Sequence, residues 1–183
     1  EGYITKGAGT MSDMFELKAI ELIAQHLKAA VDDGKNAAAR EGMSVAQYIA
    51  GMGFSNVGLG IVHSMAHPLG AFYDTPHGVA NALLPYVMEY NAESAAAPKY
   101  RDIARAMGVD TAGMSVEEGV AAAVKAVRDL SLSIGIPQRL HEIGVKEADI
   151  PALSVAAFND VCTGGNPRDT SVAEIEALYR KAF

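Results

Sequence analysis

Three of the five histidines, His63, His67 and His77, lie within fifteen residues of one another. His63 and His67 are four residues apart, so on a helix they share one face. His77 follows after a short segment, 74–76, that contains a proline. Histidine is the commonest metal ligand in proteins and the usual carrier of protons near neutral pH. We therefore expect the chemistry of this chain at this histidine cluster.

A divalent transition metal could be held by His63 with either His77 or His67. Catalytic zinc normally takes three protein ligands, and non-haem iron often takes two histidines and a carboxylate. Within the stretch 58–91 the candidate carboxylates are Asp74 and Glu89, although aspartate is also favoured in turns for backbone reasons. The alternative is that the histidines satisfy buried backbone groups in a tight corner. Three of them together, beside helix-breaking residues, favour a functional site.

Several other catalytic classes are excluded by missing motifs. His63 is followed by Ser-Met-Ala-His, so the H-E-x-x-H protease motif is absent, and no G-x-S-x-G elbow or P-loop occurs. Gly51 and Gly53 lack the third glycine of the dinucleotide fingerprint. Cys162 has no cationic neighbour in sequence that would lower its pKa, which favours a packed or pocket-lining thiol over a nucleophile. A metallohydrolase with its own ligand set would need a third strong ligand. No such ligand is evident in the sequence, so this class is not favoured.

The composition is typical of a globular chain and argues against nucleic acids and anionic membranes as partners. Half of the residues are apolar, and the formal net charge is −7 with no dense run of Lys or Arg. Nucleic acids and anionic membranes reward clustered positive charge, so neither is expected as a partner. No uninterrupted apolar run reaches the length that spans a bilayer. The single cysteine excludes an intrachain disulfide and favours a reducing, cytoplasmic setting.

The elements that must position the histidines are helical. Apolar residues recur at three- and four-residue spacing over 11–31, and we expect Gly34 to end this helix in the left-handed conformation. The next helix should begin near Asn36 or at Ser44, and glycines then punctuate 51–60, for close packing or close approach of a ligand. Pro68 predicts that the helix carrying His63 is kinked or ends near His67.

The remaining chain shows further helical segments and no alternating β pattern. A helix is expected from about residue 77 to residue 90, disturbed at Pro85, and further helices over 98–107, 115–133, 137–143, 151–162 and 171–182. The sequence therefore predicts an all-α fold, a bundle of roughly seven to nine helices at the usual helix length.

Several motifs together resemble the iron-dependent (group III) alcohol dehydrogenases. The resemblance extends over essentially the whole chain, and its specific feature is the pair of histidines spaced by fourteen residues. The motifs that carry it are Gly51-Met52-Gly53-Phe54-Ser55-Asn56, then Gly58-x-Gly60-x-x-His63-x-Met65-Ala66-His67-Pro68-Leu69-Gly70, then Pro76-His77-Gly78-x-Ala80-Asn81-Ala82, and finally Asp160-Val161-Cys162-Thr163-Gly164-Gly165-Asn166-Pro167-Arg168.

The resemblance implies a two-domain enzyme of which residues 1–183 are the metal-binding, helical C-terminal domain, of the dehydroquinate synthase-like type. The N-terminal α/β domain that binds NAD is then absent from this chain. His63 and His77 match the last two of four metal ligands. The first two, spaced Asp-x-x-x-His, are expected just upstream of Glu1, so the chain is interpreted as a truncated piece.

The resemblance also implies roles for three further residues. His67 matches a histidine near the nicotinamide that relays the alcohol proton, whereas Phe54 and Cys162 match positions that line the substrate pocket. The implied activity is an NAD-dependent interconversion of a short-chain alcohol or diol and its aldehyde, with Fe²⁺ as the metal and Zn²⁺ as an alternative.

An alternative interpretation concerns residues 1–183 without the NAD-binding domain. With half of a metal site and no cofactor domain, it is expected to be an inactive helical fragment with at most weak metal binding. Its partner would be the missing NAD-binding domain. Without that domain, an apolar surface around Phe54 and His67 would be exposed, and self-association is then expected.

Overall fold

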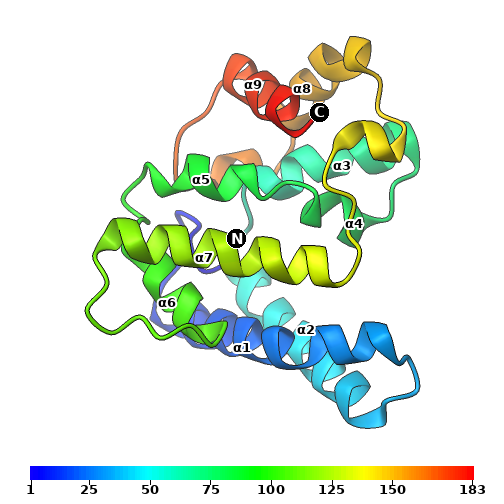
Figure 1. Cartoon of the computed structure of the whole chain (residues 1–183). Helices are drawn as coiled ribbons and strands as arrows, with labels where there is room; N and C mark the ends of the chain where they lie inside the picture. The colour runs from blue at the N-terminus through cyan, green and yellow to red at the C-terminus, as the bar shows by residue number, and fades with distance from the viewer.

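The chain folds entirely into helices. The computed structural model describes all residues 1–183 and contains nine α-helices, three short 3₁₀ helices and no strand, as the all-α prediction required (Figure 1). In chain order the elements are α1 (Thr10–Asp32), α2 (Ala37–Val57), α3 (Ile61–Tyr73), α4 (His77–Ala82), α5 (Tyr86–Ala92), α6 (Lys99–Ala106), α7 (Val116–Ser133), η1 (Leu140–Ile143), η2 (Glu147–Asp149), α8 (Ile150–Phe158), η3 (Thr163–Gly165) and α9 (Val172–Ala182).

The helices form two packed groups that share a central region. α1 and α2 make a long helical hairpin at one end of the molecule, α5 and α7 cross the middle, and α3, α8 and α9 pack together at the other end (Figure 1). The larger buried core lies in this last group and includes Met65 and Leu69 of α3. A smaller core joins Tyr3 and Ile4 to α6 and α7. The helix that carries His63 and His67 is therefore anchored in the larger core.

Most expected helices are present, with corrections at their ends. Asn36 caps α2 by accepting a hydrogen bond from the backbone N–H of Ala39, so of the two starts considered the one near Asn36 is right. The expectation that Gly34 ends α1 in the left-handed conformation is wrong. α1 ends at Asp32, and its C-cap Asp33 has an extended backbone and donates its N–H to the carbonyl of Ala29.

Pro68 does not end its helix. α3 runs through Pro68 to Tyr73, so the expected end near His67 is wrong. A proline inside a helix removes one backbone donor, which is a local cost. Pro68 and the neighbouring Leu69 are buried, and packing of this apolar face of α3 in the larger core stabilises the helix through that defect.

The predicted helix 151–162 is also shorter than expected. α8 stops at Phe158, and a tight turn follows in which Thr163 donates through its hydroxyl to the carbonyl of Ala157. This turn is part of the candidate functional site described below. By length and composition none of the helices could cross a membrane alone, and only α2 taken together with α3 meets that criterion, across a bend of 108°.

Candidate functional site

The rings of the three clustered histidines lie close together. The ring centroids of His63 and His77 are 5.3 Å apart, those of His67 and His77 are 5.7 Å apart, and those of His63 and His67 are 6.1 Å apart. His63 lies in the first turn of α3 and His67 lies one turn later. The four-residue spacing thus places both on one face, as expected.

A sharp reversal after α3 returns the chain to this face. Asp74 adopts the left-handed conformation, with φ of 53°, and its N–H bonds to the carbonyls of Gly70 and Leu69. Left-handed residues other than glycine are uncommon, and aspartate is among those that tolerate the conformation. The reversal makes His77 the first residue of α4. Asp74 therefore serves the backbone, as the turn chemistry suggested.

Neither Asp74 nor Glu89, the two carboxylates considered from the sequence, provides a partner for the histidine cluster. Glu89 binds Lys181 and Arg128 at the surface instead. The carboxylates that do contact the histidines are Glu1 and Asp160. Glu1 is 62 residues from His63 in the chain, and Asp160 is 93 residues from His67. No spacing signal could have identified contacts at this separation.

Glu1 binds both the ring and the helix of His63. Its carboxylate accepts hydrogen bonds from the backbone N–H of Val62 at 2.7 Å and of His63 at 3.1 Å, which are free donors in the first turn of α3. The same carboxylate bonds to Nδ1 of His63. Burial alone would raise the pKa of Glu1, but the bond to His63, the charge of the N-terminal ammonium and the N–H of Val62 hold it below its ordinary value. Glu1 is therefore ionised, and Nδ1 of His63 carries the proton.

A second residue missed from the sequence fixes the start of α3. Asn166 is fully buried, and its side-chain oxygen accepts from the N–H of Ile61 at 3.2 Å. Its amide also pairs reciprocally with the amide of Asn91, at 2.9 and 2.8 Å. Gly60 allows this approach, because a Cβ there would lie 2.7 Å from both Asn166 Oδ1 and Glu1 Oε1. The loop 163–168, which the sequence marked only as a turn, thus anchors the histidine helix.

Asp160 bonds to the second histidine. Its Oδ2 lies 2.8 Å from Nδ1 of His67, and its Oδ1 accepts the N–H of Cys162 at 2.9 Å. Burial would raise the pKa of Asp160, but the bonds from Cys162 and His67 hold it below its ordinary value. Each of the first two histidines is thus paired with one carboxylate through Nδ1.

The donor set fits a transition metal at the histidines. With Nδ1 of His63 bonded to Glu1, only its Nε2 remains free as a ligand, and a carboxylate behind a histidine is the usual arrangement around metal-binding imidazoles. Imidazole suits both iron and zinc. His77 has a lowered pKa, because of burial first and the neighbouring histidines second, which keeps its ring neutral and able to bind. The geometry is compatible with a metal held by His63 and His77.

A second group of ligand atoms, from His67, Asp160 and Cys162, lies within 4.8 Å. It is less suited to a metal. Burial, and then the charge of Asp160, raise the pKa of Cys162 to about 11, so its sulfur is protonated when no cation lies beside it. A metal ligand must be the thiolate. Both oxygens of Asp160 already accept hydrogen bonds. This trio is better described as a hydrogen-bonded pair, His67 and Asp160, beside a neutral thiol.

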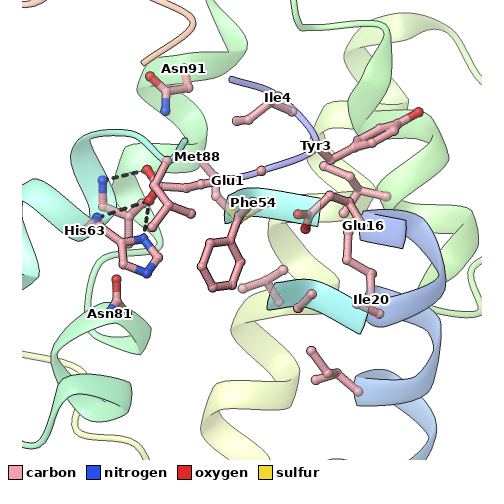
Figure 2. Close-up of a pocket in the computed structure, with 18 of the residues that line it drawn as sticks. Glu1, Tyr3, Ile4, Glu16, Ile20, Phe54, His63, Asn81, Met88 and Asn91 are labelled. Atoms are coloured by element: carbon pink, nitrogen blue, oxygen red, sulfur yellow. Dashed lines mark hydrogen bonds and ion pairs between the residues drawn. The ribbon is translucent and has the colours of Figure 1, made fainter. Parts of the chain in front are cut away.

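An apolar cavity of about 410 Å³ opens beside His63. Phe54 lines it, as does Glu16 from α1, and Figure 2 shows the Phe54 ring between His63 and the Glu16 carboxyl. Cys162 is not among the lining residues; it lies beside the His67–Asp160 pair instead. The structure therefore brings Phe54 to the cavity and Cys162 to the second histidine, and does not place both on one cavity.

Comparison with known proteins gives matches over the whole chain. A family model described as the Fe-containing alcohol dehydrogenase family, C-terminal, matches residues 1–183. Lactaldehyde reductase of Escherichia coli K12 is 58% identical over 184 residues, which cover 100% of this chain and 47% of that protein. NAD-dependent methanol dehydrogenase of Bacillus methanolicus is 39% identical and is covered to 48%.

Solved structures agree with the sequence matches. A crystal structure of 1,3-propanediol oxidoreductase superposes with a TM-score of 0.97 and 46% identity, over 100% of this chain and 48% of that chain. The chain thus spans about half the length of the curated relatives it matches.

Proposed function

The chain belongs to the Fe-containing alcohol dehydrogenase family, whose C-terminal part it matches along its whole length, and from this we propose that it is the metal-binding half of an NAD-dependent alcohol dehydrogenase. The other half would be an α/β domain that binds NAD. The observation that carries the proposal is the meeting of His63, His67 and His77, two of them hydrogen-bonded through Nδ1 to partly buried carboxylates.

His63 and His77 are proposed to hold the metal, with Fe²⁺ as the native ion and Zn²⁺ as an alternative. When bound, the metal would supply Lewis-acid polarisation of the substrate oxygen. The contribution of the chain is to present neutral imidazoles in fixed orientations. Glu1 does this for His63 by holding Nδ1 and the first turn of α3 together.

His67 is proposed to take the hydroxyl proton as the alcohol is oxidised. NAD, when bound, would accept the hydride, and the contribution of this chain would be to position the reactants. Phe54, which lines the apolar cavity, would limit the size of the substrate. Cys162, as a neutral thiol next to the His67–Asp160 pair, would contribute a small apolar wall on the other side.

The substrate is proposed to be a short-chain alcohol or diol and the corresponding aldehyde, of the lactaldehyde and 1,2-propanediol type. The support is the 58% identity to lactaldehyde reductase and the structural match to 1,3-propanediol oxidoreductase. Both names indicate three-carbon compounds with two oxygens.

The test uses the full-length protein loaded with Fe²⁺ under anaerobic conditions. We expect NAD-linked oxidation of 1,2-propanediol, read as NADH absorbance, which disappears on chelation and returns with Fe²⁺ or Zn²⁺. His67→Ala should lower kcat by about 100-fold, within the usual contribution of general acid–base catalysis, while metal content is kept. Wild-type protein that holds metal but oxidises no short alcohol with NAD would contradict the proposal.

For residues 1–183 alone we propose an inactive helical module with weak metal binding. Two neutral ligands leave a bound ion largely hydrated, and tight sites need more. Titration of the isolated chain with Zn²⁺ should give a Kd no tighter than about 10 µM, which corresponds to roughly −7 kcal/mol. Stoichiometric binding at nanomolar concentration would show that the chain holds a complete site.

A further inference from the structure

Asp160 binds both the turn that contains it and the second histidine of the cluster. Its side chain is 17% exposed, yet it lies in the turn after α8, 93 residues from the histidine that it contacts. The turn is tightly fixed. The N–H of Asp160 bonds to the carbonyl of Ala157 and the N–H of Thr163 to the carbonyl of Asp160, both at 3.1 Å. The hydroxyl of Thr163 also reaches Ser64 of α3 at 2.8 Å. The carboxylate is therefore held against α3 at a set distance.

The two oxygens of Asp160 have different partners. Oδ1 accepts from the backbone N–H of Cys162 at 2.9 Å, with the hydroxyl of Ser64 more distant at 3.4 Å. Oδ2 faces Nδ1 of His67 at 2.8 Å. A backbone N–H can only donate, so it fixes which oxygen faces the turn and which faces the histidine.

This arrangement decides the tautomer of His67. An ionised carboxylate can only accept hydrogen bonds, so Nδ1 of the neutral ring must carry the proton. The lone pair is then on Nε2, at the opposite side of the ring from Asp160. The His67 side chain is 40% exposed, so without this contact its ring could rotate or change tautomer freely.

We propose that Asp160 is a positioning residue for His67, which holds the ring with its proton on Nδ1 so that Nε2 can accept the hydroxyl proton of the alcohol. This inference rests on the proposed dehydrogenase function. In the step, the O–H proton moves to Nε2, the carbon–hydrogen bond gives its hydride to NAD, and the carbonyl forms. Nδ1 keeps its proton, and Asp160 stabilises the resulting imidazolium without being protonated. The imidazolium then releases the Nε2 proton to water.

The test variant is Asp160→Asn, which keeps the shape of the side chain. The N–H of Cys162 still selects the amide oxygen, so the amide NH₂ faces His67 and forces the proton onto Nε2. We expect kcat to fall by about 100-fold, comparable with loss of a general base, with KM within about threefold. A reversed tautomer is known to have a large effect of this kind in a histidine–aspartate pair. Metal content should be unchanged.

Two controls separate positioning from folding. Asp129→Asn removes a carboxylate from an exposed pair with Lys125 and should leave kcat within about twofold. The double variant His67→Ala with Asp160→Asn should be no slower than His67→Ala alone, because Asp160 acts only through His67. Additive losses in the double variant, or wild-type kcat in a folded Asp160→Asn enzyme, would overturn the proposal.

A spectroscopic measurement needs no activity. In Zn²⁺-loaded, full-length protein labelled with ¹⁵N-histidine, the His67 signals can be assigned by their loss in His67→Ala. We expect the Nδ1–H tautomer in the wild type and the Nε2–H tautomer in Asp160→Asn. An Nε2–H tautomer in the wild type would refute the inference. If the wild type oxidises no alcohol, the proposed function fails, while the tautomers still decide whether Asp160 orients His67.

Discussion

Glu16 is a buried carboxyl that lacks a hydrogen-bond partner for one of its oxygens. The residue is 7% exposed, and its Oε1 has no hydrogen-bond partner. It lies over Gly2 and Gly53, where a Cβ on either glycine would collide with the carboxyl. Burial is the main reason that the pKa of Glu16 is raised from its ordinary value of 4.5. A group of this kind costs stability whenever it is forced to ionise.

The sign of the pH effect follows from the raised pKa. The folded protein binds the Glu16 proton more tightly than the unfolded chain does, so stability is lost as pH rises from 4.5 through the folded pKa. Glu16→Gln cannot ionise. We expect it to raise the free energy of unfolding by about 1 kcal/mol at neutral pH and to have less benefit at pH 4. Urea unfolding at both pH values measures this.

The matched control is Glu21→Gln, since Glu21 is exposed and paired with Lys18 on the same helix. Its pKa is lowered by Lys18, so its loss should be neutral or slightly destabilising at pH 7. A Glu16→Gln protein that is less stable than the wild type at pH 7 would mean that an ionised Glu16 is stabilising.

At the residue scale the sequence predicted the groups that share a short segment. The spacing of His63 and His67 placed them on one face because helical geometry is local. Glu1, Asp160 and Asn166 could not be found in this way. Their partners are far away in the chain, and contacts between distant segments depend on packing that no spacing encodes.

At the element scale, the glycines before α3 have separate explanations. Gly58 has a φ of 81° and ends α2. Gly53 lets α2 approach Glu16 of α1, and Gly60 leaves room for Glu1 and Asn166. Gly51 faces open space, and nothing in the structure requires a glycine there. Close packing thus accounts for Gly53, and the approach of side chains that cap α3 accounts for Gly60.

The loop after α8 offers a sharp test of how α3 is held. A Cβ on Gly165 would collide with the backbone carbonyl of Leu59, directly before α3, whereas a Cβ on Gly164 would meet nothing within 4 Å. Gly165→Ala should therefore lower the free energy of unfolding by about 2 to 3 kcal/mol, as overpacking does.

Gly164→Ala serves as the adjacent control and should change stability by less than about 0.5 kcal/mol. Thermal unfolding of the two variants gives the comparison. Equal stability of the two proteins would show that the loop 163–168 does not press against the start of α3.

Helix starts were more predictable than helix ends. The capping boxes expected at Ser115 and Ser171 are short-range signals, and α7 and α9 begin directly after these residues, whereas Ser44, the other start considered for α2, lies inside that helix. The helix end that was considered near His67, before Pro68, was wrong for the opposite reason. The local cost of Pro68 is real, but burial in the larger core outweighs it, and burial is a property of the assembled fold.

At the scale of the whole molecule, the histidines lie where the two packed groups of helices meet. α3 and α4 bring the three rings, residues before α1 bring Glu1, and the turn after α8 brings Asp160. The all-α class could be predicted, because periodicity determines it. The division into two cores with the cavity between them could not, since it depends on which helices pack together.

The central claim is that His63 and His77 hold the metal of a dehydrogenase, and metal content tests it most directly. The full-length wild type, His63→Ala, His77→Ala, His67→Ala and His141→Ala would be loaded with Fe²⁺ anaerobically, dialysed and analysed for iron. His141 is exposed and bonded to the carbonyl of Phe183, so it is the control. We expect His63→Ala and His77→Ala to lose the metal and the rate together, His67→Ala to keep the metal but lose the rate, and His141→Ala to keep both. Retention of stoichiometric iron and of wild-type kcat in His63→Ala or His77→Ala would contradict the account.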